Sequence, residues 1–363
     1  MPLGELTPRT APTRPLRRTA SVAVGLALAG ALTLSACSSD PNGGSGPTTL
    51  ADGQRANIVA STDVWGSVAA AVAGDRADVT SIVTDPSADP HSFEASPRDA
   101  AAITDADLVV YNGGGYDEFI DDVLAGTPGK RTVDAFALYG TETDLHGDHG
   151  HDHTAEIAAA PADATTAPAE PAASEPDSHA GHDHDSGGVN EHVWYDLPTV
   201  DAVASQIATE LGAIDPANAA AYTANAATFH EQLHAITAIT GSIAAGHPQA
   251  PVAQSEPIAH YLLVATDLRD ETPEDFTKAI EDGNDPPPAA VAATRDLLAA
   301  KKVKVLVYNS QTQDKATQSI RETAESAGIP VVEVTETLPE GFDYIQWQTR
   351  TAEALAAAMN AAH

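Results

Sequence analysis

The chain has 363 residues, 42% of them hydrophobic, and its 18 Lys and Arg face 52 Asp and Glu, for a formal net charge of −34. A chain of this length can bury one large core or two medium ones, so we expect two domains. Such an acidic chain lacks the basic surface that nucleic-acid phosphates require, which argues against nucleic acid as a partner.

The first 36 residues predict an export signal. Four arginines within residues 9–18 precede an apolar run at 21–36 that is too short for a comfortable transmembrane helix and ends in small residues. The letters LSAC, at residues 34–37, resemble a bacterial lipobox, which implies cleavage before Cys37 and a lipid on the sulfur of this only cysteine. We therefore predict a signal peptide at 1–36 and a flexible lipid-anchored tether at 37–54. The protein would then be held on the outer, periplasmic side of the cell membrane.

After the tether, short β-rich runs alternate with helix-compatible stretches. Strands are expected at ANIVAS (56–61), ADVTSIV (77–83) and ADLVVYNGGG (106–115), with a helix over 63–74 that ends at Gly74. This βαβα pattern predicts a parallel sheet with helices on both faces.

The composition changes at residues 141–188, where Ala, Pro, Asp, Glu and His dominate and large apolar side chains are few. Such a segment cannot bury enough surface to order itself, so we predict a disordered insertion. Two helices should follow, one over 198–214 and a longer one that begins with Asp215 as its N-cap and Pro216 as its first helical residue.

The alternation resumes at residue 248, where strands are expected at 250–255, 302–309 and 329–336. Helices are expected at PIAHYLLVAT (257–266), PPPAAVAATRDLLAAK (286–301), DKATQSIRETAESAG (314–328) and from Tyr344 onward. The predicted fold class is therefore α/β, with two Rossmann-like parallel-sheet lobes at 55–197 and 248–363. A helical region at 198–247, containing one long interlobe helix, should join them.

Two loop histidines are candidate metal ligands. His91 lies in DPHSFEASPRD and His192 lies in NEHVWYDLP, both beside proline, aromatic and acidic residues. An isolated loop histidine is usually a surface residue. A ligating imidazole, however, needs a rigid loop and a carboxylate behind it, and these surroundings favour ligation.

These two segments, the run VAQSEP leading to HYL, and VVEVTETLP together resemble the zinc/manganese-binding solute receptors of bacterial ABC importers. The resemblance covers nearly the whole chain after the signal, in order. It implies four metal ligands in a cleft between the lobes: His91, His192, Glu256 and Glu336. It also implies a membrane ABC permease as the partner and no enzymatic activity, and we expect a monomer.

The residues leave open whether the bound metal is zinc or, alternatively, manganese or iron. Many zinc-binding members have a third histidine where this chain has Glu256, and the fourth ligand is usually Asp rather than Glu336. Imidazole suits zinc, whereas carboxylate oxygens suit manganese or iron. In the alternative interpretation Glu256 only caps a helix beginning at Pro257, and Glu336 is solvated.

Two histidine bursts lie within the predicted insertion. Flexible imidazoles cannot form a rigid cage, but they can bind zinc loosely and raise its concentration near His192, which favours zinc (Zn²⁺) over manganese (Mn²⁺). These accessory histidines are His146, His149, His151, His153, His179, His182 and His184.

The segment HEQLH matches the HExxH motif, in which two histidines one helical turn apart bind zinc and the glutamate acts as a general base. A metalloprotease using His230, Glu231 and His234 is therefore the alternative function. The residues that follow offer no further acidic ligand on the next helical turns, which favours two polar positions on an exposed helix face.

Overall fold

The computed structural model describes residues 50, 54–86, 88, 90–140 and 190–362, all within one compact unit, Pro47–His363. The predicted signal peptide, Cys37, most of the tether and the predicted insertion with its seven histidines lie outside the described residues. No helix in the described ranges is long and apolar enough to cross a membrane.

The N-terminal lobe is a four-stranded parallel sheet with the strand order β2-β1-β3-β4. Its strands are β1 (Ala56–Thr62), β2 (Ala77–Val83), β3 (Leu108–Tyr111) and β4 (Thr132–Asp134), and its helices are α1 (Asp63–Ala73), α2 (Pro97–Asp105) and α3 (Glu118–Ala125). Alternate residues of β1 face opposite sides: Ile58 packs in the core that contains α1, and Val59 packs with Ile103 of α2 and Phe119 of α3. The sheet is therefore buried on both faces, as the apolar strands predict.

The C-terminal lobe repeats this plan with the order β6-β5-β7-β8, again all parallel. Its strands are β5 (Pro251–Gln254), β6 (Arg269–Asp270), β7 (Leu306–Asn309) and β8 (Val331–Val334). Its helices are α6 (His260–Ala265), α7 (Glu274–Glu281), α8 (Pro288–Ala299), α9 (Lys315–Ala327) and α10 (Tyr344–Ala361). Leu306 faces the core formed with α7, α8 and α9, whereas Val307 faces the core shared with α5 and α10. The prediction of two parallel-sheet α/β lobes is confirmed.

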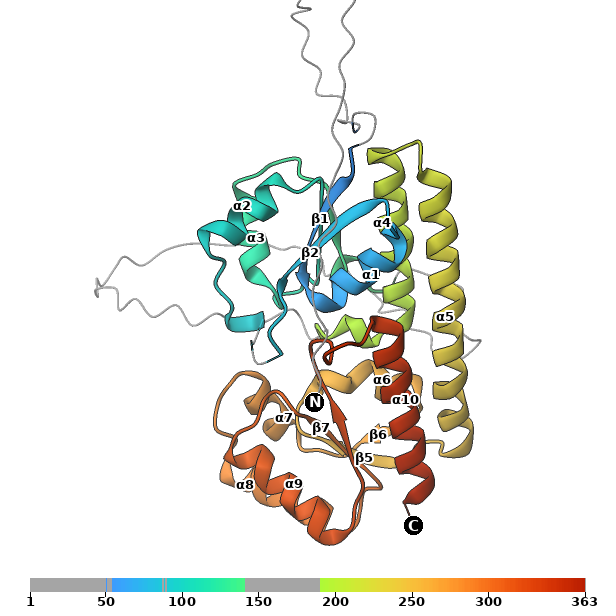
Figure 1. The fold of residues 1–363 in the computed structure, drawn as a ribbon. Coiled ribbons are helices and arrows are strands. Elements are labelled where there is room, and N and C mark those ends of the chain that lie inside the picture. The colour runs from blue at the N-terminus through green and yellow to red at the C-terminus, as the bar shows by residue number, and fades with distance from the viewer. Residues whose placement is uncertain (1–49, 51–53, 87, 89, 141–189, 363) are drawn as a thin grey trace, which may run out of the picture. The chain divides into compact units, whose positions relative to one another are not determined.

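Helices α4 (Leu197–Ile214) and α5 (Ala219–Gly246) connect the lobes. Figure 1 shows α5 beside α4 in the first half of its length and beside α10 in the second, and α5 packs against both helices. Its buried residues recur every three or four positions, which keeps one apolar stripe facing its neighbours. These residues are Tyr222, Ala226, Phe229, Leu233, Ile236, Thr240 and Ile243.

The predicted start of the long helix is wrong. Asp215 is the C-cap of α4, and α5 begins at Ala219 after Asn218. The Asp215 Oδ2 accepts hydrogen bonds from Asn218 Nδ2 at 2.7 Å and from the Tyr222 hydroxyl at 2.9 Å. Asp215 therefore stabilises the turn between the two helices, and Pro216 belongs to that turn.

Candidate metal centre

A cavity of about 880 Å³ is lined by residues of both lobes. Among the described residues, its lining contains no Lys or Arg. It contains eight acidic residues: Glu94, Glu118, Asp122, Glu191, Glu256, Glu281, Asp282 and Glu336. Carboxylates gathered around a partly enclosed space produce a negative potential that concentrates cations.

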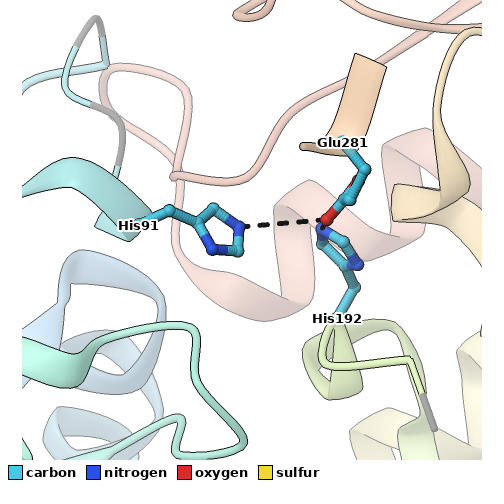
Figure 2. A group of neighbouring side chains, drawn as sticks. All are labelled: His91, His192 and Glu281. Carbon is cyan, nitrogen blue, oxygen red and sulfur yellow. Dashed lines mark ion pairs between the residues drawn. The ribbon is translucent and has the colours of Figure 1, made fainter. Parts of the chain in front are cut away.

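Two histidines and one glutamate converge within this cavity (Figure 2). The Nε2 atom of His192 lies 3.4 Å from Oε1 of Glu281, and the Nε2 atom of His91 lies 3.9 Å from the same oxygen. One potential ligand atom from each residue lies within 4.8 Å of the others, and no second such group of three or more His, Cys, Asp or Glu occurs in the described part of the chain. Three donors at this separation can bind one metal ion after small side-chain movements.

The ring of His192 is held in an orientation suited to ligation. Its Nδ1 lies 3.0 Å from Oδ1 of Asn190, so Nδ1–H donates this hydrogen bond and Nε2 keeps its lone pair toward the cavity. Asn190 is itself held by the C-terminal lobe, because its Nδ2 donates to the carbonyl of Pro257 at 2.9 Å. Burial lowers the pKa of His192 well below its usual value, and His91 and His260 lower it further. His192 is therefore a neutral imidazole at neutral pH, the form that binds metals.

Glu281 is the last residue of α7 and is only 17% exposed. Its Oε1 is buried and accepts no hydrogen bond from any described residue. Burial raises the pKa of Glu281 well above its usual value, and the charges of Glu191, Glu256 and Glu336 raise it further. A carboxylate in this position needs either a proton or a cation, because several like charges face one another in a poorly solvated space.

Glu256 and Glu336 line the same cavity from the C-terminal lobe, just after strands β5 and β8. Ligands of α/β proteins commonly bind at this carboxyl edge of a parallel sheet. The two residues are 3% and 7% exposed, so Glu336 is not solvated. The Glu256 side chain does not cap the turn at Pro257; its Oε1 accepts a hydrogen bond from Thr312 Oγ1 at 2.5 Å.

Tyr116 contacts candidate ligands of both lobes. Its ring meets that of His91 edge-on at 4.7 Å, and its hydroxyl donates to Oε2 of Glu336 at 3.2 Å. The preceding three glycines have φ between 67° and 90°, which side-chain-bearing residues rarely adopt. At Gly113, a Cβ would also lie 2.3 Å from an oxygen of Asp134, so this turn requires glycine.

All four predicted ligands thus line one cavity. Of these, only His91 and His192 lie close together, and the carboxylate beside them is that of Glu281. Glu281 was not predicted, although it ends the amphipathic segment EDFTKAIE two positions before the turn-forming Gly283. In that segment Phe276 and Ile280 are buried four residues apart. This pattern could have identified α7, and with it the residue at the end of the helix.

The HExxH residues lie elsewhere, on α5, and none of them lines the cavity. Neither histidine belongs to a group of three potential ligands within the described ranges. Glu231 is exposed. The three protein ligands that zinc proteases use are therefore not assembled here by the described residues.

The sequence matches the family described as "Zinc-uptake complex component A periplasmic" over residues 58–358. The chain belongs to this family. Members of this family are solute-binding receptors, and membership accounts for the two lobes around a cavity.

Several curated relatives of this zinc-uptake family member are named for manganese. The manganese-binding lipoprotein MntA of Halalkalibacterium halodurans is 27% identical over 203 residues, which are 56% of this chain and 53% of that protein. The manganese ABC transporter substrate-binding lipoprotein PsaA of Streptococcus mitis is 38% identical over 69 residues, 19% of this chain and 22% of that protein. The chain thus spans about half the length of the first of these relatives and less of the second.

Solved structures share the fold. The periplasmic zinc-binding protein TroA of Treponema pallidum superposes with a TM-score of 0.63 at 14% identity, covering 84% of this chain and 99% of that one. The manganese complex of FpvC from Pseudomonas aeruginosa gives 0.61 at 22% identity, covering 85% and 99%. The TM-scores support a common architecture. Sequence identities this low carry no information about which metal this chain binds.

Proposed function

We propose that this protein is an extracytoplasmic solute-binding lipoprotein that captures one divalent metal ion in the cavity and delivers it to a membrane ABC permease. The convergence of His91, His192 and Glu281 inside an acidic cavity is the observation that supports this function. The metal is cargo that is released unchanged, so we expect no catalytic turnover.

The donor set is electrostatically suited to a divalent cation. Without a cation, Glu281 is surrounded by the charges of Glu191, Glu256 and Glu336, and its pKa is raised accordingly. A bound ion would replace the proton on Glu281 and relieve this repulsion, while His91 and His192 supply neutral nitrogens. We assign these three residues as ligands, with Glu256 and Glu336, which line the cavity from the same lobe as Glu281, completing the coordination.

Zinc is the favoured cargo, because two imidazoles contribute to the site and the histidine bursts would collect zinc near it. Manganese is the second candidate, and a specific observation supports it: Glu281 adds a third buried carboxylate to the two that were predicted. Manganese takes more oxygen ligands than zinc and accepts a higher coordination number.

The histidine bursts should be dispensable for tight binding. We expect that full-length protein with all seven burst histidines replaced by asparagine keeps one tight zinc equivalent and loses only weaker ones. Calorimetric titration with zinc of this variant and of the wild type measures both classes. Loss of the tight equivalent would place the principal site in the bursts and refute a receptor site in the cavity.

Membrane attachment should depend on Cys37. Because Cys37 is the only thiol and the last letter of LSAC, Cys37→Ser is expected to release the protein from membranes into the soluble fraction. Fractionation followed by a high-salt wash separates lipid anchoring from electrostatic adsorption. A variant that stays membrane-bound through the wash would contradict the lipoprotein assignment, and it would leave the metal-binding proposal in place.

A further inference from the structure

Two histidines on the surface of α5, outside the cavity, face each other across one helical turn. The Nε2 atoms of His230 and His234 are 2.9 Å apart and share a hydrogen bond, and their rings are nearly perpendicular, at 87° with centroids 4.5 Å apart. His230 is partly buried and His234 is exposed, so solvent reaches the pair.

A buried carboxylate orients the first of these rings. Asp201 of α4 is 6% exposed, and its Oδ2 lies 3.0 Å from Nδ1 of His230. The Nδ1–H of His230 donates this hydrogen bond, so the lone pair of Nε2 is directed at His234. A carboxylate behind one nitrogen of an imidazole, with the other nitrogen free to ligate, is the usual arrangement at protein metal sites.

We propose that His230 and His234 form a second metal site, separate from the cavity, that binds a late first-row divalent cation with Asp201 orienting His230. Two nitrogens at neighbouring positions of one ion, each about 2.0–2.1 Å from it, lie about 2.9 Å apart when the angle at the metal is 90°. The 2.9 Å separation of the two Nε2 atoms matches this value. Such an angle is typical of nickel and copper, and a small rotation of the exposed His234 would widen it for tetrahedral zinc.

Water would complete the coordination, since the described residues supply no third protein ligand to this pair. The site is therefore weaker than the cavity. This second site also accounts for the HEQLH motif without protease activity. The two histidines bind a metal, and Glu231 is an exposed residue between them that takes no part.

The test uses full-length protein with the seven burst histidines replaced by asparagine and one equivalent of zinc already added to fill the cavity. Calorimetric titration with Ni²⁺ should then show one further equivalent. In the same background, His234→Ala should lower the affinity of this equivalent at least about 10-fold or abolish it. Asp201→Asn keeps the shape of the side chain but removes its charge, and it should weaken binding about 10-fold, in the range found for residues that orient a ligand.

The matched control is His247→Ala, which removes a surface histidine at the C-terminal end of α5, where its Nε2 contacts Oδ1 of Asn360. This variant should bind nickel like its parent. Because the cavity is identical in all variants, any exchange of zinc for nickel there cancels in the comparison. Equal nickel binding by the His234→Ala variant and its parent, or equal losses in the His234→Ala and His247→Ala variants, would overturn the proposal.

Discussion

Zinc affinity at the cavity is expected to fall by at least about 100-fold when His192 is replaced by alanine, because loss of a group that merely orients a ligand already costs about 10–100-fold. His192 supplies a neutral, oriented nitrogen 3.4 Å from Glu281 Oε1, and no other described histidine except His91 lines the cavity. Competition with a chelator of known zinc affinity measures the change.

His192 is 2% exposed, so its replacement also leaves a void next to Trp194. His91→Ala separates the two effects, because the His91 side chain is 20% exposed and its removal should spare folding while weakening metal binding to a similar extent. Thermal unfolding of the metal-free variants measures stability directly. His247→Ala should match the wild type in both assays, and tight zinc binding retained by both cavity variants would show that neither histidine is a ligand.

The metal preference should depend on Glu256. A carboxylate can bind through one or both oxygens and carries a negative charge, whereas an imidazole contributes one neutral nitrogen. Glu256→His is therefore expected to lower manganese affinity by at least about 10-fold more than zinc affinity, because it brings the donor set closer to the nitrogen-rich, four-coordinate geometry of zinc. Titrations with each metal and a common competitor give the ratio.

His91→Ala provides the comparison for this prediction, because it removes a nitrogen ligand and should weaken both metals. The Glu256 side chain is held by Thr312 rather than by the turn at Pro257, so the substitution leaves no helix uncapped. Equal losses for the two metals, or no loss for either, would mean that Glu256 does not touch the ion.

Local signals in the sequence are sufficient to predict three strands of each lobe, but β4, β6 and helix α7 have no predicted counterpart. Apolar runs such as ANIVAS and KVKVLVYN become the buried strands β1 and β7, since both faces of each sheet are covered by helices. His91 and His192 could be identified because each lies in a loop segment beside proline, aromatic and acidic residues. Those loops form compact turns in the structure, at Pro90–Ser92 and just before Val193–Tyr195.

Contacts between side chains that are far apart in the sequence were not predicted. Glu281 lies 89 positions after His192, and the two residues meet in a fold in which Phe276 and Ile280 bury α7 in the core of the C-terminal lobe. Asp215 was assigned to the wrong helix because aspartate followed by proline is a common helix start. The hydrogen bond from Tyr222, seven residues later, instead fixes it in the turn. The sequence pattern could have identified α7 and its last residue, but neither the proximity of Glu281 to the histidines nor the hydrogen bond between Tyr222 and Asp215.

The central claim is that one divalent ion is held between the two lobes by His91, His192 and Glu281. Anomalous diffraction at the zinc edge, from crystals of the protein loaded with one equivalent of zinc, tests it most directly. We expect a single strong anomalous-difference peak within about 2.0–2.2 Å of Nε2 of both histidines and of a carboxylate oxygen of Glu281. A principal peak at another place, or one that contacts neither histidine, would contradict it.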